Sequence, residues 1–190
     1  LVGLNTGFQG DVMVNNIPLE KKNLKTIRKN VGYVFQDADS QLFMSTVFDD
    51  VAFAPRNYGM SEAEVNEKTM EALKVVHIEQ LKDKQIYKLS GGEKKLASIA
   101  TILSTEPDVI LMDEPSVALD PKNRRNLINI LNRLNQAKII ASHDLNMIMD
   151  TCERTILLSD GKIIKDGNTK EILLDKELME ESGLELPLGY

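Results

Sequence analysis

The amino-acid sequence predicts an α/β domain with a mainly parallel β-sheet. Three short and largely apolar segments, at residues 31–35, 108–112 and 137–141, have the length of strands in such a sheet. Segments with the apolar spacing of helices lie between them, as parallel strands require. Residues 46–88 look entirely helical, so we expect a helical subdomain inserted into a single domain, 1–190.

Composition limits the class of protein. With 190 residues, 42% of them hydrophobic, the chain can bury the core of one domain. Its formal charge of -6 argues against a general nucleic-acid binder, although a local basic patch remains possible. The single cysteine, Cys152, excludes an internal disulfide and fits a reducing compartment. No apolar run approaches the ~18 residues of a membrane span, and the first residues do not resemble a signal peptide.

The segment before residue 46 contains several short elements. Residues 1–5 are expected to be the last turn of a helix that ends at Thr6-Gly7. The other elements expected here are a strand at 10–14 turned by Asn15-Asn16, a short polar helix at 21–30, and the strand 31–35, which Gln36 follows.

The predicted helical subdomain opens with two helices. Residues 46–53 carry acids in their first turns, and we expect this helix to stop before Pro55, because proline cannot continue the hydrogen-bonded ladder. Ser61 and Glu64 have the spacing of a capping box, which predicts a second helix from there to about residue 76.

The rest of the chain alternates helices and strands before a helical end. Asp160 and Gly161 lie at the centre of a clear hairpin turn. The expected elements are a strand at 108–112, a helix at 121–134, a strand at 137–141, a helix at 144–150, hairpin strands at 155–158 and 162–165, and small helices at 168–174 and 176–182 within a C-terminal segment 168–190.

Four polar side chains fall at predicted strand ends, which is where ligands bind in open parallel sheets. They are Gln36, Asp113, Glu114 and His143. A carboxylate at Asp113 can hold Mg²⁺ directly or through water, and Glu114 can polarise a water that attacks a phosphate. Taken singly, each has a plainer interpretation as a solvated loop residue, a helix cap or a structural side chain.

A glycine-rich stretch, Lys88–Leu96, is the other candidate site. Ser90 and Glu93 have capping-box spacing, so a helix is expected to begin here. Gly91 and Gly92 let the backbone come very close to a ligand, and the free amides of a helix N-terminus favour anions. The alternative is an ordinary glycine-rich turn before a helix.

The order of these motifs resembles that of the ABC ATPases. Leu89–Glu93 looks like their signature motif, and it is followed by Asp113-Glu114-Pro115, by Ser116–Asp120 and by His143. The resemblance implies a P-loop-NTPase-like fold that binds ATP and Mg²⁺ and hydrolyses ATP. The roles that it implies are catalytic for Glu114, His143 and Gln36, metal-binding for Asp113 and Gln36, and nucleotide-binding for Leu89, Ser90, Gly91, Gly92, Glu93 and Asp120. One mild departure is Val117-Ala118, where many relatives carry a glycine.

A narrower resemblance is to the ATPase subunits of energy-coupling-factor importers. Residues 34–44, 46–47 and 50–55 carry it, and the tail 178–187 resembles the cobalt/nickel branch more than the vitamin importers. It implies a peripheral location on the cytoplasmic face of the membrane. It also implies a second ATPase subunit, arranged head to tail as a homodimer or heterodimer, a transmembrane coupling subunit and a substrate-binding membrane subunit, with no nucleic acid. Leu42, Phe43 and Met44 would line an exposed apolar groove for a membrane-partner helix, unless they are local core.

The phosphate-binding P-loop motif of the family does not occur in the sequence. None of the eleven glycines starts the pattern Gly-x-x-x-x-Gly-Lys-[Ser/Thr]. In the family the helix after that loop runs directly into the segment that matches residues 1–4. We therefore expect the first strands and the P-loop to be missing upstream, the chain to be a fragment or a truncated gene product, and the chain alone to be inactive.

Two competing functions remain open at this stage. One is a degenerate, non-hydrolysing ABC subunit that completes a partner's site, which the absent P-loop favours. The other is a non-transport ABC ATPase acting on DNA or ribosomes. Such proteins carry a long coiled coil or a second cassette, whereas here Gln36 and Ser90 are joined by a short helical segment and the charge is negative.

Overall fold

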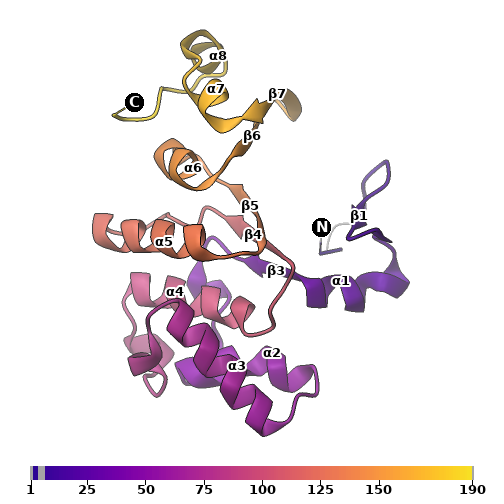
Figure 1. Cartoon of the computed structure of the whole chain (residues 1–190), viewed down its shortest axis with the longest axis vertical. Coiled ribbons are helices and arrows are strands. Elements are labelled where there is room, and N and C mark those ends of the chain that lie inside the picture. The colour runs from indigo at the N-terminus through magenta and orange to yellow at the C-terminus, as the bar shows by residue number, and fades with distance from the viewer. Residues whose placement is uncertain (1, 4–6, 190) are drawn as a thin grey trace.

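A parallel sheet of three strands lies at the centre of the molecule (Figure 1). The structure is a computed structural model that describes residues 2–3 and 7–189, so the helix end expected at residues 1–5 falls largely outside the described residues. The strands stand in the order β3-β4-β5, and both neighbouring pairs are parallel. The predicted α/β class with a parallel sheet is therefore confirmed. The strands are β3 (Val31–Val34), β4 (Val109–Asp113) and β5 (Ala137–Ala141).

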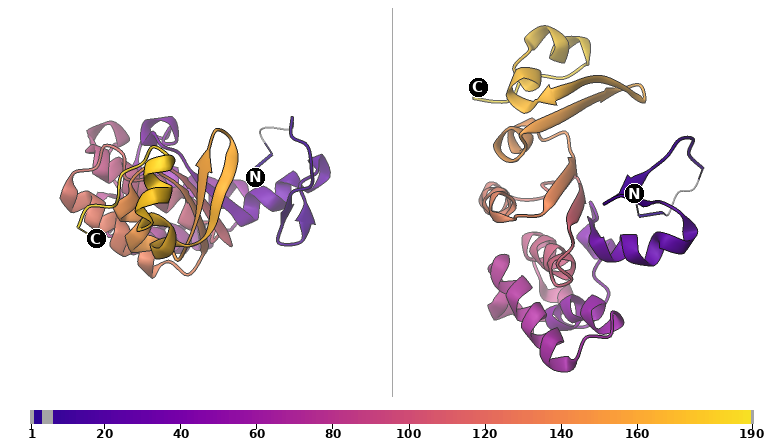
Figure 2. Two further views of the ribbon diagram at one scale, coloured as in Figure 1. Left: turned by 90° about the horizontal axis from the view of Figure 1, so that it is seen from above. Right: turned by 45° about the vertical axis from the view of Figure 1, so that its right-hand side comes forward.

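Helices cover one side of this sheet (Figure 2). The largest fully buried side chains include Ile110 of β4 and one residue from each of three helices, namely Ile99, Leu127 and Met147. On the other side Ile139 of β5 stays 55% exposed. The helices concerned are α4 (Gly91–Leu103), α5 (Pro121–Arg133) and α6 (Leu145–Thr151).

Between β3 and β4 the chain is helical, as the sequence predicted. The capping box at Ser61 and Glu64 forms with both of its reciprocal hydrogen bonds. The two helices of this segment, α2 and α3, pack against each other and against α4. The elements are a short 3₁₀ turn, η2 (Ala38–Ser40), then α2 (Val47–Asn57), α3 (Glu62–Val75), η3 (Glu79–Leu81) and η4 (Ile86–Lys88).

The helix α2 does not stop before Pro55, and that expectation is wrong. Proline removes the N–H that would bond the carbonyl of Val51, four residues earlier. The hydroxyl of Ser104, at the end of α4, donates to that carbonyl at 2.9 Å and replaces the missing donor. A side chain distant in sequence therefore allows α2 to continue through the proline to Asn57.

The loop after β3 gives a second correction. Leu42 is only 6% exposed and belongs to the main core, so it does not line an exposed groove. Phe43 is 64% exposed, and its ring meets that of Phe53 edge-on at a centroid distance of 4.8 Å. The buried carboxylate of Asp50 accepts the backbone N–H groups of Phe43 and Met44, at 3.2 and 3.0 Å, and so fixes this segment.

One β-hairpin lies in the N-terminal part of the chain and another precedes the last two helices. Asn15 and Asn16 have φ values of 50° and 62°, which suits a tight two-residue turn, and the strand expected at 10–14 is only two residues long. Asp160 and Gly161 form the second turn, with φ values of 49° and 73°. The N-terminal elements are β1 (Met13–Val14), β2 (Ile17–Pro18), η1 (Lys21–Asn23) and α1 (Leu24–Asn30); the C-terminal ones are β6 (Arg154–Ser159), β7 (Lys162–Asn168), α7 (Thr169–Leu173) and α8 (Lys176–Glu181).

No helix in the described part of the chain is long and apolar enough to cross a lipid bilayer.

Candidate functional site

The four polar residues of the strand ends gather at one edge of the sheet. Gln36 follows β3, Asp113 and Glu114 stand at the end of β4, and His143 follows β5. Because these strands are parallel neighbours, their carboxyl ends lie side by side. The hydroxyl of Tyr33, on β3, donates to Asp113 Oδ2 at 3.4 Å and links the first two strand ends.

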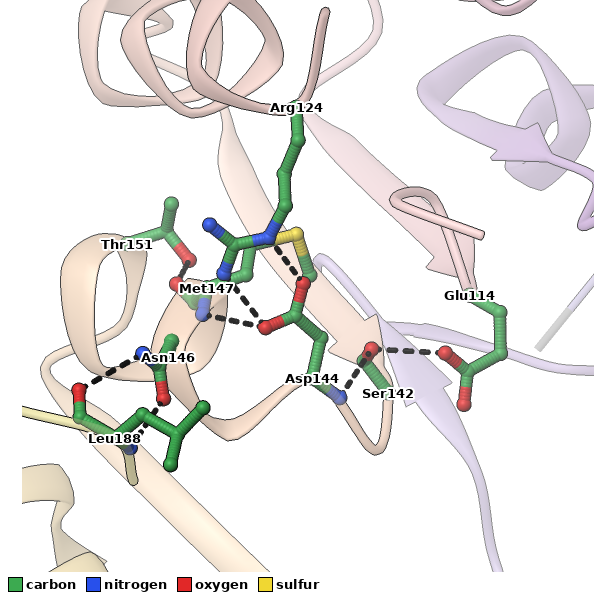
Figure 3. Close-up of polar contacts among 8 residues, drawn as sticks. All are labelled: Glu114, Arg124, Ser142, Asp144, Asn146, Met147, Thr151 and Leu188. Atoms are coloured by element: carbon green, nitrogen blue, oxygen red, sulfur yellow. Dashed lines mark hydrogen bonds and ion pairs between the residues drawn. The ribbon is translucent and has the colours of Figure 1, made fainter. Parts of the chain in front are cut away.

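Glu114 is held by the residues that follow β5. Its Oε2 accepts the hydroxyl of Ser142 at 2.8 Å (Figure 3), and its Oε1 accepts the backbone N–H of His143 at 3.0 Å. The same Oε1 lies 2.7 Å from His143 Nδ1. Glu114 adopts a φ of 42°, a backbone conformation that side chains other than glycine seldom adopt and that recurs at functional sites. Two of the three residues expected to be catalytic, Glu114 and His143, are thus in direct contact.

The His143 ring is largely exposed to solvent, and its second nitrogen, Nε2, does not take part in the contact with Glu114. The side chain is 76% exposed, whereas that of Glu114 is 19% exposed. The hydrogen bond to Glu114 raises the pKa of His143 above its ordinary value, because the carboxylate favours the protonated ring. With Nδ1 donating to Glu114, Nε2 is available for an anion that approaches from outside. For Gln36, which is exposed, no hydrogen bond joins its side chain to these residues within the described part of the chain.

An ion pair between Arg124 and Asp144 supports the segment after β5 that holds Glu114 (Figure 3). The guanidinium of Arg124 donates two hydrogen bonds of 2.6 Å to the carboxylate of Asp144, which also caps α6 by accepting the N–H of Met147. The backbone N–H of Asp144 donates to Ser142 Oγ at 3.1 Å, and that hydroxyl donates onward to Glu114. Arg124 is not among the residues expected from the sequence, because nothing in the pattern around it indicates that it meets Asp144 across the fold.

The pKa of Asp144 is strongly shifted. Partial burial acts to raise it, but the hydrogen bonds from Arg124, from the N–H of Met147 and from Ser116 outweigh burial and lower the pKa to about 2. The side chains of Arg124 and Asp144 are 29% and 20% exposed. This is a partly buried, bidentate ion pair of the kind that stabilises the carboxylate form.

The glycine-rich stretch begins α4 as predicted. Ser90 Oγ accepts the N–H of Glu93 at 3.3 Å, and Glu93 Oε2 accepts the N–H of Ser90 at 2.7 Å, which completes the capping box. Glu93 also pairs with Lys84 at 3.1 Å. The N–H of Ser90 is the main cause of a lowered pKa at Glu93, and the Lys84 ammonium adds to it. The carboxylate of Glu93 is therefore already occupied within its own subunit.

The two glycines serve different purposes. A Cβ on Gly92 would lie 2.5 Å from Asn123 Nδ2, so glycine there lets the start of α4 approach α5 closely. A Cβ on Gly91 would meet nothing within 4 Å, and Gly91 is exposed. Packing within the chain therefore does not require a glycine at Gly91, which leaves its backbone open to a ligand outside. Leu89 is 7% exposed in the core, so only its main chain can take part.

Asp120 begins α5. Its carboxylate accepts the N–H groups of Lys122 and Asn123 at 2.9 and 3.0 Å, and these bonds, that from Asn123 above all, lower its pKa. Just before it, Ala118 has a φ of 62°, a conformation that favours glycine. A glycine at this position would adopt the same backbone conformation without strain.

The strand-end residues fit a magnesium ion. Within the described residues no group of three or more His, Cys, Asp or Glu side chains could hold a metal by itself. Mg²⁺ does not require such a group, because it prefers oxygen donors and is usually bound by one or two protein ligands together with phosphates and water. The carboxylate of Asp113 and the amide oxygen of Gln36, on neighbouring strand ends, are donors of this kind.

A cavity lies beside this site rather than on it. It has a volume of 970 Å³ and lies between α5, α6 and the tail at residues 185–188, with His143 at its border. Asn146 holds the tail through two hydrogen bonds to Leu188, of 2.9 and 3.0 Å (Figure 3). Glu114, which His143 contacts at the strand ends, does not line this cavity.

Comparison with known proteins decides the family. A family model described as ABC transporter matches residues 1–117. A putative ABC transporter ATP-binding protein of Geobacter sulfurreducens is 47% identical over 95% of this chain and 73% of its own length. The chain belongs to the ATP-binding proteins of ABC transporters. It is therefore a transport-coupled ATPase by family.

Further likeness places this ABC protein in the energy-coupling-factor type. The energy-coupling factor transporter ATP-binding protein EcfA of Carboxydothermus hydrogenoformans is 40% identical over 99% of this chain and 70% of its own length. Among solved structures, cbiO1 from Clostridium perfringens matches with a TM-score of 0.84 and 34% identity, covering 95% of this chain and 74% of that one. That protein is described as part of the ABC transporter complex cbiONQ.

The ion pair behind the site predicts a pH dependence of stability. The pKa of Asp144 is lowered on folding, so its contribution to the free energy of unfolding is present above the unfolded pKa of 3.8 and is lost as the pH falls through about 2. With allowance for partial exposure, this contribution is about 1–2 kcal/mol. Urea unfolding of the wild type and Asp144→Asn should differ by this amount at pH 6 and converge toward pH 2. Asn keeps the acceptor that caps α6.

The matched control is Asp166→Asn, which removes the carboxylate of an exposed ion pair with Arg154. Its effect on the free energy of unfolding should be much smaller at every pH. A difference between the wild type and Asp144→Asn that persists undiminished at pH 2 would show that the ion pair is not its source.

Proposed function

We propose that this ABC protein hydrolyses ATP for an energy-coupling-factor importer, with Glu114 orienting the attacking water. The observation that supports this role is the way Ser142 and His143 hold the Glu114 carboxylate at the sheet edge. An ionised carboxylate has about four lone-pair positions, so its oxygens can also accept from a water. His143 then contacts the γ-phosphate, and its raised pKa favours the protonated, phosphate-binding form.

We propose Asp113 and Gln36 as the protein ligands of Mg²⁺, held directly or through water. When bound, the ion neutralises charge on the transferred phosphate. Asp113 stands at the end of the buried strand β4, with Tyr33 donating to one of its oxygens, so its direction is constrained. Gln36 begins a loop that runs from the sheet to the helical segment 46–88. A movement of that segment can therefore change the position of Gln36 relative to the metal.

The signature stretch, Leu89–Glu93, is proposed to act on the nucleotide of a second ATPase subunit arranged head to tail. Ser90 and Gly91 are exposed, and nothing lies within 4 Å of a Cβ placed on Gly91. Asp120 is exposed at the start of α5 and would lie along the same interface. Each composite site would combine the strand-end residues of one subunit with the signature of the other.

The wider assembly follows the likeness to EcfA and cbiO1. We propose a transmembrane coupling subunit and a substrate-binding membrane subunit as partners, which would hold this protein at the cytoplasmic face of the membrane. The sequence of the tail 178–187 supports uptake of cobalt or nickel ions rather than a vitamin. A separate subunit selects the substrate, so this chain provides energy and not specificity.

Removing the Glu114 carboxylate should slow the catalytic step. Glu114→Gln in the assembled transporter should keep ATP binding but slow hydrolysis by about 10²–10³-fold, because the group that orients water is lost while metal and phosphate contacts remain. The pKa of His143 should also fall toward its ordinary value, as followed by NMR titration. Glu79→Gln, at an exposed site, is the control. Steady-state hydrolysis near the wild-type rate would remove Glu114 from this role.

An exposed aromatic pair, one ring of which comes from α2, is the surface on which we expect the membrane partner to dock. Phe43 and Phe53, 64% and 41% exposed, form an aromatic pair that the buried Asp50 holds in place. An amphipathic helix of the partner can pack its apolar face on such a pair. Phe43→Asp with Phe53→Asp should abolish co-purification with the transmembrane subunit, while circular dichroism stays unchanged.

Its control is Ile163→Asp, the same apolar-to-acid change at a 64% exposed position on the distant β7. This variant should still co-purify. Survival of the complex in the double aromatic variant would exclude this surface as the docking site.

A subunit that completes a partner's site without hydrolysing ATP itself is the second candidate, and the exposed Ser90 and Gly91 at the start of α4 are the observation that favours it. The triphosphate cradle of the family is its P-loop, whose pattern does not occur in these 190 residues, and the strand-end residues are mostly acidic or neutral. The purified 190-residue chain should therefore show no micromolar binding of Mg-ATP by calorimetry. It should still restore some hydrolysis to an intact subunit whose own signature serine is mutated.

The control is the same chain carrying Ser90→Ala, which should restore nothing. Tight Mg-ATP binding by the chain alone would reveal a phosphate cradle elsewhere and exclude the degenerate function.

A further inference from the structure

A buried lysine lies beside the proposed magnesium ligands. Lys95, in the second turn of α4, is 3% exposed. Within the described residues no carboxylate forms an ion pair with it. Its ammonium instead donates to two backbone carbonyls, those of Phe35 at 3.0 Å and Gln36 at 2.7 Å. Lysine is rarely so buried, because removing its charge from water is unfavourable unless hydrogen bonds compensate.

The two carbonyls belong to the peptide units where the chain leaves β3. The hydrogen bonds from Lys95 hold these peptide units in one orientation. This fixes the backbone at Gln36 and limits the positions that its side chain can reach. The ring of Phe35 packs edge-on against that of Tyr33 at a centroid distance of 5.0 Å, and Tyr33 donates to Asp113. Both proposed metal ligands are thus connected to the place where Lys95 binds.

Further contacts bind the same loop to α4. Gln41 Nε2 donates to the carbonyl of Ser98 at 2.7 Å and to Thr101 Oγ1 at 2.9 Å, while its Oε1 accepts the N–H of Phe35 at 3.0 Å. These contacts hold the middle of the loop against α4 and join it to Phe35. Lys95 holds its beginning, where Gln36 lies, from the helix that starts with the signature stretch.

A cavity of 290 Å³ lies where these segments meet. Gln36, Gly91 and Lys95 line it together with residues 117–119, which precede Asp120. Burial lowers the pKa of Lys95, and the nearby charges of Asp37 and Asp113 act in the opposite direction.

We propose that Lys95 is a positioning residue, which fixes Gln36 for Mg²⁺ binding and couples that residue mechanically to the signature helix of the same subunit. This inference rests on the proposed role of Gln36 as a metal ligand. Residues that orient a metal ligand from outside the coordination shell typically change metal affinity or activity by about 10–100-fold when mutated.

The first experiment measures ATP hydrolysis by the assembled transporter as a function of Mg²⁺ concentration. Lys95→Met keeps the length and apolar stem but loses the donors, and it should raise the half-saturating Mg²⁺ concentration by about 10-fold or more. Lys95→Arg can donate to both carbonyls and should restore most of the loss. Lys74→Met, at an exposed site on α3, should leave the curve unchanged. If Lys95→Met does not fold, Lys95→Gln is measured in its place. Because glutamine keeps a donor group, the expected rise in the half-saturating Mg²⁺ concentration is smaller.

A second measurement needs neither nucleotide nor metal. Hydrogen exchange at residues 35–42 should become faster in Lys95→Met and stay unchanged in Lys74→Met. A curve for Lys95→Met that matches the wild type, or a defect that Lys95→Arg leaves uncorrected in the folded protein, would overturn the inference.

A double-mutant cycle with Gln36→Ala separates this inference from the proposed function. If Lys95 acts through Gln36, the Lys95→Met change should add little to the Mg²⁺ requirement of Gln36→Ala. Full additivity would overturn the positioning role. An unchanged Mg²⁺ requirement in Gln36→Ala alone would instead overturn the metal role of Gln36, and the inference about Lys95 would fall with it.

Discussion

The parallel alignment of β3, β4 and β5 is the constraint on which the site depends. Parallel strands in one sheet end at the same edge, so residues far apart in the chain are brought together there. The pairing of Asp113 with Ala141 places the end of β4 next to the segment after β5. Glu114 can then accept hydrogen bonds from Ser142 and His143 without any long side chain reaching across the fold.

The residues that cap the N-termini of the helices also connect neighbouring elements of the fold. Asp144 caps α6 and, through Arg124, joins α5 to the strand end that holds Glu114. Asp120 caps α5, whose Asn123 lies against Gly92 at the start of α4. The polar groups that cap the N-termini of these helices therefore also connect neighbouring motifs. This suits a protein whose proposed work is to transmit the state of a nucleotide to a membrane partner.

Local features of the structure were predictable because neighbouring residues cause them. The capping boxes at Ser61 and Ser90, and the turn at Asp160-Gly161, depend on side chains three or fewer residues apart. The strand-end placement of Gln36, Asp113, Glu114 and His143 followed from the strands themselves. The roles of these residues came from resemblance to ABC ATPases, since spacing alone does not distinguish a catalytic acid from a solvated one.

The sequence by itself determined the order of helices and strands, their caps and turns, and the set of residues at the sheet edge. Only the tertiary structure decided which side chains support them. Pro55 lies within α2 because Ser104 satisfies a carbonyl from another helix, and Leu42 is core because α2 and its neighbours cover it. Arg124 meets Asp144, and Lys95 meets the carbonyls after β3, across 20 and about 60 residues of chain. Such contacts depend on how elements pack in space, and no local pattern of residues encodes that packing.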